Sequence, residues 1–323
     1  MWTLPRRWLI GLSGLSAVVM AIALTAAVTG GAARAATGTT PGSEPATTAV
    51  RHTVGKDAQA AARAFWTKAR MAAATPIGQA SAKGGPASAK GGPASTAKPP
   101  PGIPNPIHFN GVRTVGALFF TTGTQAHFCT ASVVDSFRFD LVLTAAHCVY
   151  GSSYATNIAY VPEWHKGVSP YGSWAVQTIT VAAGWVHSQN PNLDFAFLTV
   201  TPPPGTWRPI QFVTGGLRLG INAGYAHPIY VIGYNDTDGQ PVGCATTSFK
   251  FETDQMKFYC NSFWDGTSGG PWILHYNRVT GSGTVLGDIG GYEQGGDYPW
   301  ASYSAYYSRS ILRLFFEAQY QQA

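Results

Sequence analysis

Three side chains in the second half of the sequence have the types needed to break an amide bond: His147, Asp194 and Ser268. A serine becomes a nucleophile when a histidine takes its proton, and the histidine serves as a base when a carboxylate fixes its ring. Asp194 directly precedes the apolar run Phe195–Val200, where a buried carboxylate would need a donor such as an imidazole N–H. We therefore predict that Ser268 attacks, His147 moves the proton and Asp194 orients the histidine.

Glycines flank the serine in the run Asp265-Gly-Thr-Ser-Gly-Gly-Pro-Trp272. Glycine permits the unusual backbone angles of a tight turn. Such a turn can aim the backbone amides of Gly266 and Ser268 at one point, which is the geometry that stabilises a developing oxyanion. We expect these two amides to form the oxyanion hole.

The same glycines satisfy the Gly-x-Ser-x-Gly turn of α/β hydrolases, so an esterase is one alternative. That fold requires an acid and then a histidine after the serine. Here His275 is the only histidine that follows Ser268, and it precedes Asp288 and Asp297. The order of residues therefore disfavours the esterase.

The motifs Thr-Ala-Ala-His-Cys at 144–148 and Thr-Ser-Gly-Gly-Pro at 267–271, with Asp194 between them, resemble the chymotrypsin family of serine proteases. The order His, Asp, Ser is typical of that lineage. The resemblance covers roughly residues 112–320 and is greatest to secreted actinobacterial proteases. It implies an all-β fold of two packed six-stranded antiparallel Greek-key β-barrels with a C-terminal α-helix.

The resemblance also implies a serine endopeptidase that acts on protein or peptide substrates through an acyl-enzyme intermediate. It implies no cofactor. The alternative within the family is a catalytically inactive member that binds partners through its loops. Turnover of a casein or peptide panel would separate the two.

One departure from the family concerns activation. Animal members carry an aspartate directly before the serine, which pairs with a new N-terminal ammonium, whereas this chain has Thr267. That ion pair cannot form. We therefore expect a prosegment to act as a folding aid or a cover.

A second departure concerns the specificity pocket. Trypsin-like members place an aspartate six residues before the nucleophile, where this chain has Ser262, so a preference for Lys or Arg is not supported. Asp265 or Asp288 could still enter the pocket. We expect Ser262 on one wall, and on the other the residues Ile289, Gly290 and Gly291.

Four cysteines occur in the sequence, at positions 129, 148, 244 and 260. An even number in an exported chain predicts two disulfides, for which three pairings exist. We favour Cys129–Cys148 and Cys244–Cys260, because each pair lies within one candidate barrel; the first also resembles the first-barrel disulfide of the family. No Cys-x-x-Cys or His-x-x-x-His spacing accompanies them, so we expect no metal site.

After Pro106 the sequence consists of short apolar runs separated by Gly, Pro, Asn and Asp, which predicts closely spaced strands. The expected strands are 115–120, 133–134, 141–144, 195–200 and 229–232. Helical periodicity is found at 308–318, where Ile311, Leu314 and Phe315 share one face.

The N-terminal third has a different composition. Residues 1–35 contain Arg6 and Arg7, a long apolar run and a small-residue site at Ala33–Ala35, which predicts a signal peptide. The alternative is an uncleaved membrane anchor, and the sequence leaves Sec and twin-arginine export open. Residues 36–105 are rich in Ala, Thr, Pro and Gly and predict a propeptide or low-complexity linker outside the core, the alternative being a retained stalk. Within this range, the alanine-rich stretch 57–74 with Phe65 and Trp66 could form a helix that docks on another part of the protein. Residues 106–323 form the expected protease domain.

The net charge of +6 comes from the N-terminal part. Residues 1–105 carry 11 Lys and Arg against 2 Asp and Glu, whereas 106–323 carry 10 against 13. Because the folded part is mildly acidic, nucleic-acid binding is not expected. We expect a secreted, extracellular monomer with no stable membrane association after signal cleavage.

Overall fold

The computed structural model describes residues 48–77, 98–235 and 239–320. All of them belong to the unit Ser43–Ala323. The expected signal peptide, 1–35, lies outside the described residues. No helix in the described ranges is long and apolar enough to cross a membrane.

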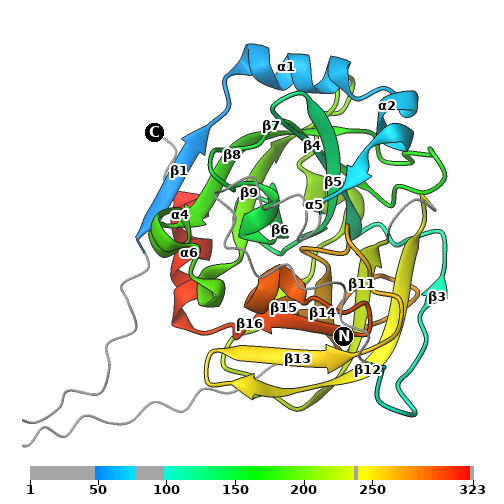
Figure 1. Cartoon of the computed structure of the whole chain (residues 1–323). Helices are drawn as coiled ribbons and strands as arrows, with labels where there is room; N and C mark the ends of the chain where they lie inside the picture. The colour runs from blue at the N-terminus through cyan, green and yellow to red at the C-terminus, as the bar shows by residue number, and fades with distance from the viewer. Residues whose placement is uncertain (1–47, 78–97, 236–238, 321–323) are drawn as a thin grey trace, which may run out of the picture. The chain divides into compact units, whose positions relative to one another are not determined.

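The first half of the range 106–323 contains a closed antiparallel barrel of six strands (Figure 1). Each strand pairs with the next around the ring, and the last pairs with the first. In ring order the strands are β4 (Val115–Thr122), β5 (Gln125–Val133), β6 (Leu141–Thr144), β9 (Ala196–Thr201), β8 (Trp174–Ala182) and β7 (Thr156–Pro162). Their β-branched and aromatic side chains are almost all buried, as expected for strands that enclose a core.

The second half is a sheet of six antiparallel strands. In order they are β15 (Thr284–Asp288), β14 (Pro271–Leu274), β11 (His227–Tyr234), β12 (Pro241–Glu252), β13 (Gln255–Tyr259) and β16 (Ala301–Ala305). Among the described residues β15 and β16 do not pair, so this sheet is a half-barrel. Two short strands extend it, β10 (Arg218–Leu219) beside β15 and β3 (Ile107–His108) beside β12.

The predicted fold class is confirmed, including the helix at the end of the chain. Helix α6 (Arg309–Tyr320) buries Ile311 and Leu314, the face that the sequence pattern indicates, and contacts β8 and β9. Two short helices connect strands, α4 (Ala183–Ser188) and α5 (Ile210–Thr214).

Residues 48–77, which we call the N-terminal segment, are part of the folded structure. The segment forms β1 (Ala49–Thr53), α1 (Lys56–Phe65), α2 (Lys68–Ala73) and β2 (Thr75–Pro76). Trp66 and Met71 are buried in a cluster with aromatic residues of the first barrel. The linker composition expected for 36–105 therefore does not extend to 48–77, where the docking helix expected at 57–74 is found as α1 and α2; the propeptide assignment stays a prediction.

The reason lies in strand edges that the barrel leaves open. Strand β7 pairs with β8 only at 174–175, and β1 pairs with the edge that remains, from Thr178 to Ala182. Strand β6 pairs with β5 only at Ser132 and Val133, and β2 takes the edge at His127 and Phe128. Unpaired strand edges favour addition of another strand, and composition alone does not reveal this.

Candidate functional site

His147 and Asp194 are brought together by the pairing of two strands. Strands β6 and β9 pair antiparallel, with Thr144 opposite Ala196. The end of β6 therefore lies beside the start of β9. His147 follows β6 in the short helix η1 (Ala146–Cys148), and Asp194 directly follows the short helix η2 (Pro191–Leu193) that precedes β9.

The Asp194 carboxylate is fully buried and accepts three hydrogen bonds. His147 Nδ1 lies 2.8 Å from Oδ2, and the backbone amide of His147 donates to Oδ1 at 2.9 Å. The backbone amide of Gly291 donates to Oδ2 at 2.9 Å. A buried carboxylate is stabilised when N–H donors satisfy its oxygens, so the Asp194 carboxylate is well placed to orient the imidazole through Nδ1.

Gly290 and Gly291, predicted as pocket residues, lie against this carboxylate. A Cβ on Gly290 would come within 2.9 Å of Asp194 O and 3.1 Å of Oδ2. Gly291 has φ of +76°, a conformation that favours glycine. The sequence analysis did not predict that the Gly291 amide would bind Asp194. The Gly-Gly pair, which can mark a close approach of the backbone to another group, was the one signal for it.

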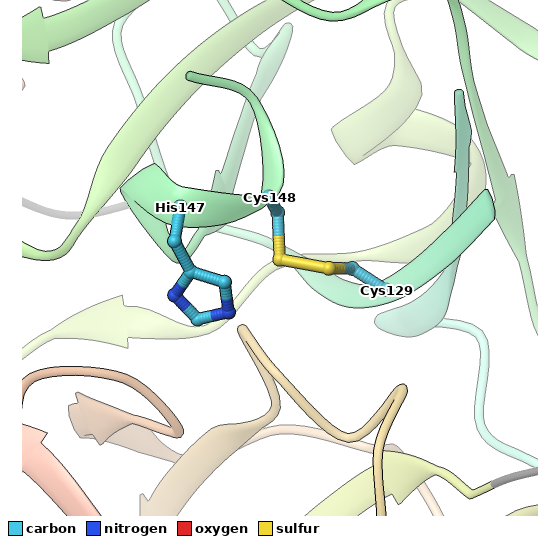
Figure 2. Close-up of side chains that lie close together, drawn as sticks. All are labelled: Cys129, His147 and Cys148. Carbon is cyan, nitrogen blue, oxygen red and sulfur yellow. A yellow bond between two sulfur atoms is a disulfide. The ribbon is translucent and has the colours of Figure 1, made fainter. Parts of the chain in front are cut away.

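The other ring nitrogen of His147 faces the opposite way. In the described part of the chain Nε2 is buried and has no hydrogen-bond partner. Figure 2 shows the ring beside the Cys129–Cys148 disulfide. The sulfurs and the imidazole lie close enough to suggest a metal cluster, with ligand atoms within 4.8 Å of one another. Because both sulfurs are in the disulfide, they are not thiolate ligands.

Both disulfides are the local pairs that the sequence favours. The second, Cys244–Cys260, joins β12 to the residue after β13 within the half-barrel.

Ser268 lies in a tight turn after β13, packed against the first barrel. Gly266 and Gly269 have φ of +93° and +78°. The Ser268 carbonyl accepts the amide of Thr130 at 2.8 Å, and a Cβ on Gly269 would lie 2.9 Å from the amide nitrogen of Ala145. The turn therefore lies against the chain two residues before His147. Among the described residues the Ser268 hydroxyl forms no hydrogen bond with His147.

Ile289 connects the serine turn to the residues that hold Asp194. The amide of Gly269 donates to the Ile289 carbonyl at 2.7 Å, and the Ile289 amide donates to the Gly270 carbonyl at 2.9 Å. The next two residues contact Asp194, as described above. The strand end after β15 thus contacts both the serine turn and the buried carboxylate.

Of the two predicted oxyanion amides, one already has a partner. The Gly266 amide donates to the carbonyl of Ile77, in the N-terminal segment, at 3.3 Å. No acceptor for the Ser268 amide is found among the described residues.

The candidates for the specificity pocket lie in different environments. Ser262 is partly exposed, and its carbonyl accepts the side-chain amide of Asn235 at 2.8 Å. Asp265 is exposed. The suggestion that Asp288 enters a pocket is wrong: its side chain is fully buried, and the Tyr307 hydroxyl donates to Oδ1 at 2.7 Å. Burial, with the Asp194 charge nearby, raises the pKa of Asp288 well above its usual value.

Part of the sequence matches one known family, and the fold is similar to those of solved proteases. Residues 129–281 match the family described as a trypsin-like peptidase domain. No curated protein matches the chain.

Three solved structures illustrate the likeness of fold. Protease Anisep from Arthrobacter nicotinovorans is 24% identical, with a TM-score of 0.59 over 66% of this chain and 99% of that one. The thermostable serine protease AL20 from an extremophilic microorganism is 22% identical, with a TM-score of 0.58 over 65% and 98%. A Glu endopeptidase in complex with MPD is 16% identical, with a TM-score of 0.53 over 68% and 99%.

Proposed function

We propose that His147, Asp194 and Ser268 are the catalytic triad of this chain, which belongs to the chymotrypsin- and trypsin-like family of serine proteases and is a serine endopeptidase. Ser268 Oγ attacks the carbonyl carbon of the scissile peptide bond. His147 Nε2 takes the hydroxyl proton and then delivers it to the leaving amine. An acyl-enzyme forms on Ser268, and water, activated by the same nitrogen, releases it.

The observation that carries this proposal is the pair of hydrogen bonds between His147 and Asp194. The carboxylate binds both the backbone amide and Nδ1 of the histidine, so the ring has one orientation and one tautomer. With the proton on Nδ1, the lone pair of Nε2 is free to accept another. The missing hydrogen bond from Ser268 does not argue against this role, because catalytic hydrogen bonds often tighten only when substrate binds.

The backbone amides of Gly266 and Ser268 stabilise the tetrahedral intermediate in this mechanism. Removing one such donor costs about 3–4 kcal/mol in comparable sites. Ser262, Ile289, Gly290 and Gly291 remain our proposed pocket residues. The Gly291 amide also donates to Asp194, and Gly290 leaves room for its carboxylate.

We further propose the route of export and maturation that the sequence indicates. Residues 1–35 direct export, 36–105 form a propeptide, and the mature protease, 106–323, acts as an extracellular monomer. The two disulfides support an oxidising compartment. N-terminal sequencing of secreted protein tests both cleavage sites.

The test of the triad is substitution of the nucleophile. Ser268→Ala should remain folded by circular dichroism but lose labelling by a fluorophosphonate probe and lose hydrolysis of casein. The matched control is Ser188→Ala, because this serine is exposed and bonds only within α4. If Ser268→Ala still labels and cleaves like the wild type, the assignment is wrong.

A further inference from the structure

The carbonyl of Ile77 occupies the hydrogen-bonding position that the proposed mechanism gives to a substrate oxyanion. Strand β2 lies parallel to β5, with Thr75 beside His127 and Pro76 beside Phe128. One residue later, the Ile77 amide donates to the Phe128 carbonyl at 3.0 Å, and the Ile77 carbonyl accepts the Gly266 amide at 3.3 Å.

Side chains hold the same short stretch in place. Ile77 is 4% exposed and belongs to the large apolar cluster that includes Cys129 and Cys148 of the first half and Ile232 of the second. The Thr75 hydroxyl lies 3.1 Å from His127 Nδ1 and 3.3 Å from the Ala126 carbonyl. Backbone and side-chain contacts thus both fix the position of the Ile77 carbonyl.

The rest of the N-terminal segment anchors this stretch to the first barrel. Strand β1 pairs with β8 over five residues, and α1 contacts β7 and β8 (Figure 1). The buried Trp66 indole donates to the Asn157 carbonyl. Gly266, in contrast, belongs to the turn between β13 and β14 of the half-barrel. Ile77 therefore connects the two halves of the domain at the serine turn.

We propose that the open edge of β5 beside the Gly266 turn is a binding site for an extended peptide with a buried aliphatic side chain, and that the chain fills this site with its own Thr75–Ile77. This inference rests on the proposed function, because it takes the Gly266 amide to be an oxyanion donor. While Ile77 is bound, that amide is not available to a substrate carbonyl. The protease is then held inactive by its own segment although His147 and Asp194 are already in place.

The inhibition follows from competition for one donor. A substrate carbonyl can reach the Gly266 amide only in the fraction of molecules in which Ile77 has withdrawn. The apparent reactivity of Ser268 is reduced by that fraction. A change that weakens Ile77 binding, without touching the triad, should raise reactivity.

The experiment compares the full-length wild type with Ile77→Asp. A carboxylate is strongly disfavoured in the apolar site that Ile77 fills, so Thr75–Ile77 should leave the edge of β5. We expect the rate of Ser268 labelling by a fluorophosphonate probe to rise at least about tenfold. The matched control is Val279→Asp, at a valine that is 93% exposed, which should label like the wild type. Ile77→Asp combined with Ser268→Ala should not label.

A second measurement uses the wild type alone and does not depend on the variant folding. Hydrogen exchange of the peptide containing Ile77 should be slow before labelling and faster once the probe's phosphonyl oxygen has displaced the Ile77 carbonyl.

The outcomes separate this inference from the proposed function. Equal labelling rates for wild type and Ile77→Asp, or unchanged exchange at Ile77 after labelling, would overturn the inference and leave the protease assignment intact. A folded Ile77→Asp that neither labels nor hydrolyses casein would contradict the triad itself, and the inference with it.

Discussion

Replacing Asp194 by asparagine tests the part of the site that is most completely defined. The carboxylate accepts N–H groups at both oxygens, from His147 twice and from Gly291 once. An amide of the same shape has one oxygen and one NH2 group. Whichever way it turns, the NH2 group faces a backbone N–H, either that of His147 or that of Gly291.

The two orientations impair catalysis by different routes. With NH2 at the Oδ2 position, His147 Nδ1 must accept, the ring proton moves to Nε2, and Nε2 cannot take the serine proton. With NH2 at the Oδ1 position the tautomer is kept, but the negative charge that stabilises the imidazolium is lost. The wrong tautomer costs about 10⁴-fold in kcat in a triad of this type, and general-base catalysis as a whole contributes about 10²–10⁴-fold.

We therefore expect Asp194→Asn to lower kcat/KM by about 10²- to 10⁴-fold. One unsatisfied buried N–H should also destabilise the fold by about 1–3 kcal/mol, or roughly 2–12 °C in Tm. The assay is hydrolysis of a peptide substrate with thermal unfolding on the same samples, and Asp254→Asn is the control because Asp254 is exposed. A folded Asp194→Asn protein within tenfold of wild-type kcat/KM would refute the reasoning.

Two further predictions concern residues around Asp194. Burial raises the pKa of Asp288, so the native state binds the carboxyl proton more tightly than the unfolded state does. The free energy of unfolding therefore falls as pH rises from about 4, the pKa in the unfolded state, towards the higher pKa in the folded state. Asp288→Asn cannot ionise and should match the wild-type Tm near pH 4 but exceed it near pH 8 by calorimetry; a lower Tm at pH 8 would count against a neutral Asp288. Gly290→Ala places a Cβ against the Asp194 carboxylate and should lower kcat more than tenfold with little change in KM; unchanged kcat would show that the site tolerates the methyl group.

The sequence predicts the fold well where local pattern and fold agree. The strands expected at 115–120, 141–144 and 229–232 all lie within observed strands, because β-branched and aromatic runs between turn residues suit a buried pleated surface. The C-terminal helix follows from its 3.6-residue periodicity. The openness of the half-barrel between β15 and β16 depends on pairing between distant strands, which periodicity does not encode.

The candidate site is predictable only in part for a similar reason. His147 and Asp194 could be chosen because their residue types and order have a chemical meaning. The Gly291 amide could not, since a backbone donor carries no side-chain signature. Ile77 lies in a stretch whose alanine-rich composition resembles a linker, and its contacts depend on an open edge of β5 that exists only in the folded barrel.

Thr267, where animal members of the family have an aspartate, bears on how the enzyme is activated. The Thr267 side chain is buried, and its hydroxyl donates to the Trp264 carbonyl at 2.8 Å, so the serine turn is closed by a local bond without a new N-terminal ammonium. We therefore do not expect cleavage of the prosegment to activate the enzyme by rearranging this turn. With Asp194 fully satisfied and the turn already formed, our proposal places the control of activity at the oxyanion donor, where the Ile77 carbonyl accepts the Gly266 amide. Activation then requires departure of the N-terminal segment and not assembly of the site, so the protease should become active without a requirement for one particular mature N-terminus.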